Sequence, residues 1–174
     1  MIRFLSYYTR FRDAQSLSAQ LGGLLKLNGW RIATAESVTA GRIAALISMT
    51  SGASEYLEGG DVVYNIDRKV QKLGVGREEA ALCDCVSKSV AEQMAIGSRQ
   101  ANGNADIGIA TTGYCGAYPE QGITEPYAWV AIDFQGHIWS FIVHGKETMS
   151  RTEAKDLYAR EAVRSLVNIL GVQG

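Results

Sequence analysis

Apolar residues in the first part of the chain follow helical spacing, then cluster, then return to helical spacing. The leucines of residues 13–28 recur every three or four positions, which predicts an amphipathic helix that ends at Gly29. The apolar run over 30–35 predicts a short buried strand, and helical spacing resumes near Thr39. This part of the chain therefore predicts a helix, a strand and a second helix.

The middle of the chain continues this alternation. The expected elements are a strand over 61–64 after a turn at Gly59-Gly60, a helix over 65–74, a helix over 87–101 with Ser87 as its N-cap, and a strand over 106–110. Residues 111–126 contain glycines and prolines without periodicity, so we expect a long loop there. Loops of that length in compact domains are usually functional or disordered.

The last part of the chain predicts a hairpin followed by a long helix. Residues 127–134 and 138–143 alternate around Gln135-Gly136-His137, which is typical of a β-hairpin. Residues 150–170 carry apolar side chains at helical spacing. Helices that alternate with strands, plus one antiparallel hairpin, predict an α/β fold: a three-layer α/β/α arrangement around a mixed sheet.

Length and composition favour a single domain. The chain has 174 residues, of which 47% are hydrophobic and 20% charged, as in ordinary globular proteins. No repeat or Pro/Ser-rich linker divides it. We expect residues 13–174 to form the domain. Residues 1–12 are aromatic-rich and lack the features of a signal peptide, so we expect an N-terminal extension that packs on the domain or is disordered.

Charge and cysteine usage exclude several classes of protein. The net charge is −1, so no basic field attracts nucleic acid or a membrane surface, and no apolar run reaches the ~18 residues of a spanning helix. Three cysteines, an odd number without a CxxC motif, indicate a reducing cytoplasm. Cys83-x-Cys85 has no further Cys or His partners at metal-site spacing, so we expect two small buried thiols and no metal.

The first candidate for chemistry is Ser37, in the strand-to-helix junction over 34–41. Backbone N–H groups at the start of a helix favour an anion, either a phosphate or a developing oxyanion. The alternative is purely local, because serine and threonine are common helix N-caps and either Ser37 or Thr39 is placed for that role.

The second candidate is Lys69, in another strand-to-helix junction over 63–69. A serine nucleophile needs a base, but His137 and His144 lie in or beside the predicted hairpin and no GxSxG motif is present, which disfavours a Ser-His-Asp triad. A lysine whose pKa is lowered by its environment is able to serve instead. The alternative is that Lys69 is a solvated charge on a helix surface.

The third candidate is the segment 111–117, which follows a predicted strand. A glycine-containing turn there presents backbone N–H groups that suit an anion. The segment has neither the Walker pattern nor GxGxxG, so by itself it is a weak phosphate-binding signal.

Six segments of the chain match, in order, the signature segments of one known family. TAESVTAGRIA resembles TAESCTGG, VVYNIDRKVQKLGV resembles (V/T)TYSNEAK…LGV, CVSKSVAEQMAIGS resembles AVSE…V…EMA.GA, ADIGIATTGYCGAY resembles AD…SGIAGP, PYAWVAI resembles P.GTV, and SRTEAKDLYAREAVRSLVNIL resembles R..VR…A…L. Together these segments cover about residues 14–170. The chain therefore resembles the C-terminal domain family of the competence/damage-inducible protein CinA.

This resemblance implies an amide hydrolase that converts nicotinamide mononucleotide to nicotinate mononucleotide and ammonia. It implies Ser37 as nucleophile, Lys69 as general base and Tyr64 as a proton-shuttling or orienting hydroxyl. The residues expected to frame the substrate and its phosphate are Thr39, Gly41, Thr112, Gly113, Gly116 and Arg151. It implies no metal or organic cofactor. We further expect a small phosphorylated nucleotide as the ligand and a homo-oligomer as the assembly.

The chain departs from the family pattern around the expected substrate. The departures are Val38 for Cys, Ala40 for Gly, Ile66 for Asn, Tyr114 for Ile, Ala117 for Pro, Ala128 for Gly and Lys155 for Arg. Two hypotheses therefore stand: an active amide hydrolase, and a non-catalytic relative that binds a nucleotide-like ligand or a protein partner. We expect Ser37, Tyr64 and Lys69 to converge in one cleft beside the 112–116 segment. The non-catalytic hypothesis instead predicts a solvent-exposed Lys69. We expect Arg151 and the N-terminus of the helix after Ser37 to hold the phosphate.

Overall fold

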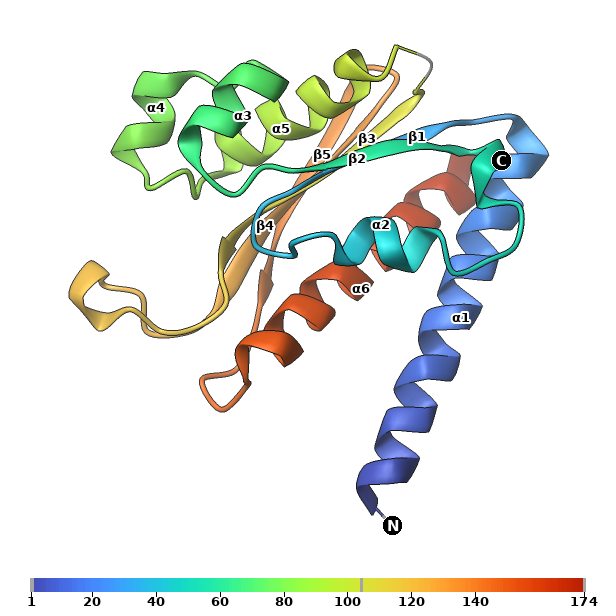
Figure 1. The fold of residues 1–174 in the computed structure, drawn as a ribbon, viewed down its shortest axis with the longest axis horizontal. Helices are drawn as coiled ribbons and strands as arrows, with labels where there is room; N and C mark the ends of the chain where they lie inside the picture. The colour runs from blue at the N-terminus through green and yellow to red at the C-terminus, as the bar shows by residue number, and fades with distance from the viewer. Residues whose placement is uncertain (1, 104, 174) are drawn as a thin grey trace.

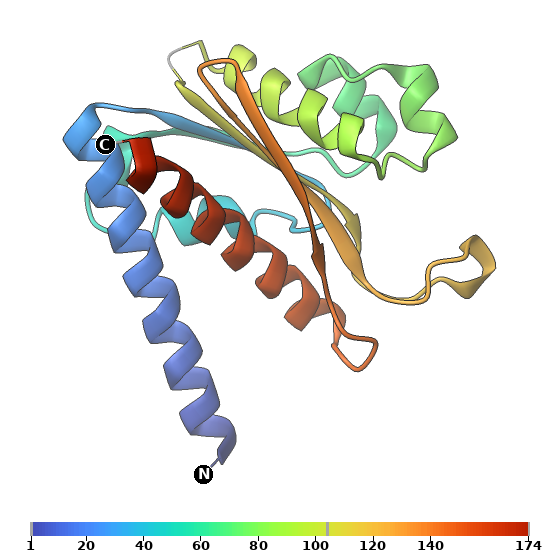
Figure 2. The same cartoon turned by 180° about the vertical axis from the view of Figure 1, so that it is seen from behind.

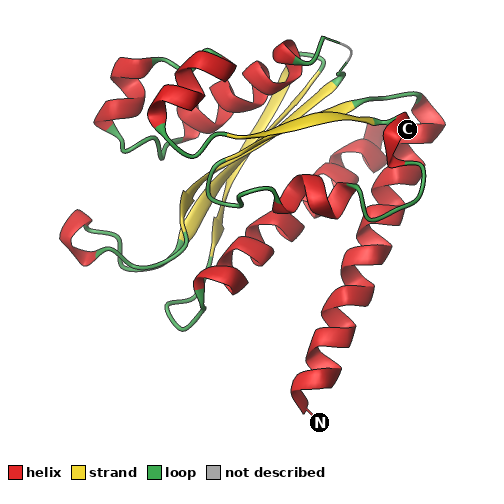
Figure 3. Ribbon diagram, viewed as in Figure 1, coloured by secondary structure: helices red, strands yellow, loops and turns green. Residues whose placement is uncertain are grey.

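The computed structural model describes residues 2–103 and 105–173, and it describes the side chains of residues 12–103 and 105–172. In chain order the elements are α1 (Ile2–Asn28), β1 (Ile32–Glu36), α2 (Arg42–Ile47), η1 (Ala53–Glu55), β2 (Leu57–Val62), α3 (Ile66–Leu73), α4 (Arg77–Leu82), α5 (Lys88–Ala101), β3 (Ile107–Tyr114), η2 (Pro119–Gln121), β4 (Tyr127–Phe134), β5 (His137–His144) and α6 (Arg151–Gln173). Figure 1 and Figure 3 show their arrangement.

The described residues form a five-stranded mixed sheet in the order β2-β1-β3-β4-β5. β1 runs parallel to β2 and β3, whereas β3, β4 and β5 are antiparallel neighbours. Helices α3, α4 and α5 lie on one side of the sheet and α1, α2 and α6 on the other (Figures 1 and 2). The predicted three-layer α/β/α fold with one antiparallel hairpin is confirmed.

Each face of the sheet buries its own hydrophobic cluster. All five residues of β1 are buried, as expected for a central strand covered by helices on both faces. One cluster packs Leu21 of α1 and Leu166 of α6 against Ile109 of β3, and the other packs Met94 of α5 against the opposite face. Gly108 permits the close approach of α5, because a Cβ there would lie 2.0 Å from the Ala95 carbonyl oxygen.

Several predicted boundaries in the middle of the chain are wrong. Gly59-Gly60 belongs to β2 rather than to a turn, because these residues pair with Ala33 and Thr34 of β1. β2 consequently ends at Val62, and Tyr64 lies beyond it. Helix α4 has only six residues and was not expected.

The expected long loop over 111–126 is shorter than predicted. β3 continues to Tyr114, since residues 111–114 pair with residues 127–130 of β4. Thr112 and Gly113 are therefore strand residues. Residues 115–126, which we call the β3–β4 arm, project away from the sheet and contain η2 (Figures 1 and 2).

Helix α1 begins earlier than the spacing of its leucines predicts. Its backbone is helical from Ile2, and residues 2–12 continue the same helix as residues 13–28. The N-terminal part of α1 runs away from the layers of the domain (Figure 1). In the part of the chain that the structure describes, no helix combines the length and apolar character needed to cross a membrane.

Candidate active site

The candidate active site lies at the edge of the sheet where the carboxyl ends of β1 and β3 meet. A cavity of about 590 Å³ opens there. Its lining combines the segment after β1, the start of α3, the turn between α4 and α5, the end of β3, the β3–β4 arm and the start of α6. Neighbouring parallel strands gather such segments, because their carboxyl ends share one edge of the sheet.

Ser37 and Lys69 meet in this cavity. Lys69 Nζ and Ser37 Oγ form a hydrogen bond of 3.0 Å. Lys69 is 1% exposed and Ser37 is 8% exposed. The first turn of α3 delivers the lysine, and Asn65 starts that turn as the N-cap by accepting a hydrogen bond from the Arg68 N–H at 2.9 Å. A buried amine is thus held directly against a buried hydroxyl.

Burial is the main influence on the pKa of Lys69. Removal of the ammonium from water lowers the pKa of Lys69 below its ordinary value, and the nearby Cys85 and Asp84 act in the opposite direction. Ile66 lines the cavity one turn before the lysine and packs against the hydrophobic cluster on this face. The alternative expectation, that Lys69 is a solvated surface charge, is therefore wrong.

Tyr64 lines the same cavity, but its hydroxyl does not join the pair. Its carbonyl oxygen accepts a hydrogen bond of 3.4 Å from Lys69 Nζ, so its main chain helps to hold the amine. Its side chain is 57% exposed, and Lys155 Nζ lies 5.8 Å from the ring centroid. Within the described residues, no hydrogen bond links the Tyr64 hydroxyl to Ser37 or Lys69.

Glu36, which the sequence analysis did not single out, organises the segment around Ser37. Its carboxylate is fully buried and accepts hydrogen bonds from Thr39 Oγ1 at 2.7 Å, from the Ile43 N–H at 3.0 Å and from the Ala44 N–H at 2.8 Å. The carboxylate thus satisfies the N-terminus of α2 from within the protein. An acidic residue at the end of the strand that leads into a helix was the available signal for this role.

This arrangement corrects four expectations. The N-terminus of α2 is not available to a phosphate, because its Ile43 and Ala44 N–H groups already donate to the Glu36 carboxylate. Thr39 is fully buried and hydrogen-bonded to Thr111 Oγ1 at 2.7 Å, so it faces the protein interior rather than the cavity. The N-cap of α2 is Gly41, with a φ of 91°, so neither Ser37 nor Thr39 caps the helix and Gly41 does not line the cavity.

The end of β3 forms another wall of the cavity. Thr112 and Gly113 both line it. Thr112 Oγ1 donates a hydrogen bond of 2.7 Å to the Cys85 carbonyl, which ties β3 to the turn between α4 and α5. Gly113 lies so close to β4 that a Cβ there would be 2.3 Å from the Tyr127 carbonyl oxygen. Gly116 is not among the residues that line the cavity.

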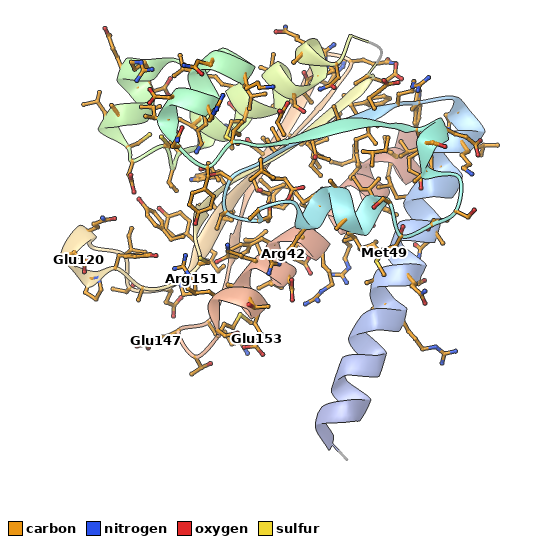
Figure 4. The ribbon with its side chains drawn as sticks, viewed as in Figure 1. Arg42, Met49, Glu120, Glu147, Arg151 and Glu153 are labelled. Atoms are coloured by element: carbon orange, nitrogen blue, oxygen red, sulfur yellow. The ribbon has the colours of Figure 1, made fainter. Side chains whose placement is uncertain are left out.

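Arg151, the first residue of α6, lies at the open side of the cavity. Figure 4 shows it at the start of α6, whereas Glu120 lies far out on the β3–β4 arm. Arg151 lines the cavity and its Nη1 donates a hydrogen bond of 2.8 Å to the Tyr118 hydroxyl. A guanidinium has five N–H donors, so this contact leaves donors for a bound anion.

The turn between α4 and α5 adds two residues that were not expected in the site. Asp84 and Cys85 line the cavity, and both have left-handed backbone conformations, with φ of 49° and 59°. Asp84 Oδ2 accepts a hydrogen bond of 3.1 Å from the Tyr114 hydroxyl. Cys83 and Cys85 are only partly buried, so the expectation of two buried thiols is wrong.

The chain is similar to proteins of one family over nearly its whole length. Residues 14–170 match the CinA C-terminal domain family. A CinA-like protein from Rippkaea orientalis is 36% identical over 166 residues, which cover 93% of this chain and 36% of the relative. A CinA-like protein from Chloroherpeton thalassium is 42% identical over 100 residues, or 58% of this chain and 24% of the relative. The chain thus spans about a third or less of the length of these curated relatives.

Solved structures agree with this assignment. The competence damage-inducible protein A (ComA) from Klebsiella pneumoniae subsp. pneumoniae MGH 78578 has a TM-score of 0.85 and 28% identity, over 91% of this chain and 97% of that one. The competence/damage inducible protein CihA from Agrobacterium tumefaciens has a TM-score of 0.82 and 28% identity, over 90% of this chain and 95% of that one. The chain belongs to the CinA C-terminal domain family.

Proposed function

We propose that the protein is an amide hydrolase of the nicotinamide-nucleotide deamidase type, which converts nicotinamide mononucleotide to nicotinate mononucleotide with release of ammonia. The observation that carries the proposal is the buried 3.0 Å hydrogen bond between Lys69 Nζ and Ser37 Oγ inside a cavity. A hydroxyl next to a buried amine has the arrangement of an activated nucleophile and its base.

The first half of the proposed reaction forms an acyl-enzyme. Neutral Lys69 accepts the Ser37 proton while Ser37 Oγ attacks the carboxamide carbon. The resulting lysine ammonium then protonates the amide nitrogen, and the C–N bond breaks to release ammonia. The lowered pKa of Lys69 suits this cycle, because it favours the neutral amine that accepts the Ser37 proton.

The second half returns the enzyme to its starting state. A water molecule gives a proton to neutral Lys69 and attacks the ester carbonyl. Lys69 then returns the proton to Ser37 Oγ as the C–O bond breaks, and the product forms as the carboxylic acid, which loses its proton to solvent and leaves as the carboxylate. Each step moves one proton between Lys69 and the reacting atoms, so no other titrating side chain is required.

The oxyanion needs a donor other than the N-terminus of α2. The Ser37 N–H is already bonded to the Thr111 carbonyl at 3.0 Å. Val38 follows the nucleophile and lines the cavity, so we assign its backbone N–H to the developing oxyanion. An N–H of the residue after the nucleophile is also the donor that serine hydrolases of other folds use.

Arg151 is assigned to the phosphate of the nucleotide. It lies on the cavity lining, at the start of α6, and has donors beyond the one bonded to Tyr118. A cavity of about 590 Å³ is within the range of pockets that hold small-molecule ligands. The phosphate would then lie near the opening and the carboxamide near Ser37.

One observation favours the second hypothesis, a protein that binds such a nucleotide without turnover. The Tyr64 hydroxyl, which the family resemblance implies in the chemistry, makes no hydrogen bond with Ser37 or Lys69 within the described residues. Its position on the cavity lining leaves it able to contact a bound substrate instead. The two hypotheses differ in a single measurable product, ammonia.

The test is ammonia release from a panel of amides: nicotinamide mononucleotide, nicotinamide riboside, nicotinamide and glycinamide ribonucleotide. We expect release from nicotinamide mononucleotide, and a loss of about 10³-fold or more in Ser37→Ala and Lys69→Met. Lys72→Met is the matched control, since Lys72 lies on the same helix but pairs with Asp61 at 3.5 Å on the surface. Tight binding of the nucleotide without ammonia release would establish the non-catalytic alternative.

A further inference from the structure

An aromatic wall lines one side of the cavity. Tyr114, the last residue of β3, and Tyr118 of the β3–β4 arm both line it, with ring centroids 5.6 Å apart and planes tilted by 54°. Tyr127 packs against Tyr114 in a T-shaped pair with centroids also 5.6 Å apart. The family pattern has isoleucine at the position of Tyr114, so the aromatic ring is a departure of this chain.

Hydrogen bonds hold Tyr114 at both ends. Its hydroxyl donates to Asp84 Oδ2 at 3.1 Å. Its carbonyl oxygen accepts a hydrogen bond of 2.9 Å from the Tyr158 hydroxyl of α6. Burial is the main cause that raises the pKa of Tyr114 above its ordinary value, so the phenol stays protonated and keeps donating to the carboxylate. The ring is therefore presented in a fixed orientation.

The backbone that carries Asp84 is strained. Asp84 and Cys85 have φ of 49° and 59°, in the left-handed region that side chains other than glycine rarely adopt. The Cys85 N–H donates to the Ala80 carbonyl at 2.7 Å, and the Cys85 carbonyl accepts from Thr112 Oγ1 at 2.7 Å. Such strain persists only where the surroundings enforce it, and it gathers at binding sites. Here the strained turn places a carboxylate on the cavity lining.

A fixed tyrosine ring beside a carboxylate attracts one kind of ligand in particular. The face of a tyrosine ring binds cations through its quadrupole, and a carboxylate adds a full negative charge. A planar cation satisfies both groups at once, because it stacks on the ring while its charge remains near the carboxylate. A neutral aromatic ring gains only the stacking contact.

We propose that Tyr114 and Asp84 form a subsite for a planar cationic ring, the pyridinium of a nucleotide amide, and that they select charged ring amides over neutral ones. The assignment of this ring to an amide substrate rests on the proposed function. What the subsite adds to that function is the two residues, Tyr114 and Asp84, that recognise the charge of the substrate ring. Tyr114 touches the ring, and Asp84 both orients Tyr114 and faces the positive charge.

The experiment compares two ligands that differ in ring charge. 1-Methylnicotinamide is cationic and nicotinamide is neutral, and both carry the same carboxamide and lack a phosphate. Their dissociation constants are measured by NMR titration of the full chain carrying Ser37→Ala, so that neither ligand is consumed. We expect the cation to bind about ten-fold more tightly. Added Tyr114→Ile should reduce this preference to about two-fold or less, whereas Tyr114→Phe should keep most of it.

The carboxylate is tested separately, with a matched control. Asp84→Asn should lower the preference by about three-fold, whereas Asp61→Asn should leave it unchanged, because Asp61 pairs with Lys72 outside the cavity. If Tyr114→Ile does not fold, Asp84→Asn alone decides the question, and an undiminished preference in that variant overturns the subsite. Equal affinity for the two ligands in the starting protein, or an undiminished preference in both Tyr114→Ile and Asp84→Asn, would overturn the subsite.

These outcomes are separable from those of the hydrolase assay. Ammonia release together with a preference independent of Tyr114 and Asp84 would leave the hydrolase standing and remove the subsite. A preference that depends on Tyr114, without ammonia release from any amide, would leave the subsite standing and remove the hydrolase.

Discussion

The amine of Lys69 and the hydroxyl of Ser37 are joined by a buried 3.0 Å hydrogen bond although they lie 32 residues apart in the chain. Because the lysine must be neutral to accept the serine proton, turnover should rise with pH through the pKa of Lys69. Burial lowers that pKa below its ordinary value of 10.5, so the rise should fall well below pH 10.5. Rates of ammonia release measured from about pH 5 to about pH 10 check this expectation. A rate that is still rising steeply near the ordinary lysine pKa would contradict the assignment.

The same burial has a consequence for folding stability. Below its folded-state pKa, Lys69 is charged in both states and the folded protein bears the cost of the buried ammonium. Between that pKa and the ordinary 10.5, the unfolded chain binds more protons, so stability rises with pH. Lys69→Met should therefore stabilise the protein by about 1 kcal/mol near pH 6, and by less near pH 9. Urea unfolding at both pH values measures the difference, with Lys72→Met as the surface control. A Lys69→Met variant that is less stable than the wild-type protein at the lower pH would refute this account.

Ala40 occupies a conformation that suits glycine. Its φ is 51°, and its Cβ makes this left-handed backbone costly. Ala40→Gly should stabilise the protein by about 0.5–1 kcal/mol, since the relief of strain exceeds the added freedom of the unfolded chain. The control is Ala45→Gly, an exposed position in the ordinary helical backbone of α2, which should destabilise by about 1 kcal/mol. Opposite signs for the two substitutions in thermal unfolding are the expected result. A loss of stability in both would show that Ala40 is not strained.

Arg151 should matter only for ligands that carry a phosphate. Loss of its charge-assisted hydrogen bonds in Arg151→Ala should raise KM for nicotinamide mononucleotide by about 10–100-fold. For nicotinamide riboside the change should stay within about two-fold, because the riboside lacks the phosphate. Arg164→Ala is the matched control, since Arg164 lies on the same helix and pairs with Glu161. Equal losses for nucleotide and riboside would indicate a structural role for Arg151, such as holding Tyr118.

Hydrophobic periodicity was sufficient to predict the class of fold and the order of most elements. It failed where pairing between strands overrides local composition. Gly59-Gly60 has the composition of a turn, but Gly60 lies in β2 where a Cβ would be 2.3 Å from Thr34 Oγ1, so glycine serves close packing there. Thr112 and Gly113 also have the composition of a loop, but they pair with Trp129 and Ala128 of β4 and therefore belong to a strand.

The candidate site was predictable in part. The positions of Ser37 and Lys69 at two strand-to-helix junctions were visible in the sequence, and the topology of the sheet brings those junctions together. The roles of Glu36 and Asp84 could not be predicted from the sequence, because they depend on the direction in which each carboxylate points. The Glu36 carboxylate points toward the start of α2. Asp84 lies in a turn with a left-handed backbone, and the turn contains no glycine that would have indicated this conformation.

Glu36 and Ser37 are adjacent in the chain and face opposite directions, one anchoring α2 inside the protein and the other lining the cavity. A saturation mutagenesis screen scored by growth or product alone would therefore find both positions equally intolerant. It would count a structural carboxylate among the residues that carry the chemistry of the proposed hydrolase. Scoring the abundance of each variant alongside its activity resolves the pair, because a defective Ser37 leaves an intact protein and a defective Glu36 does not.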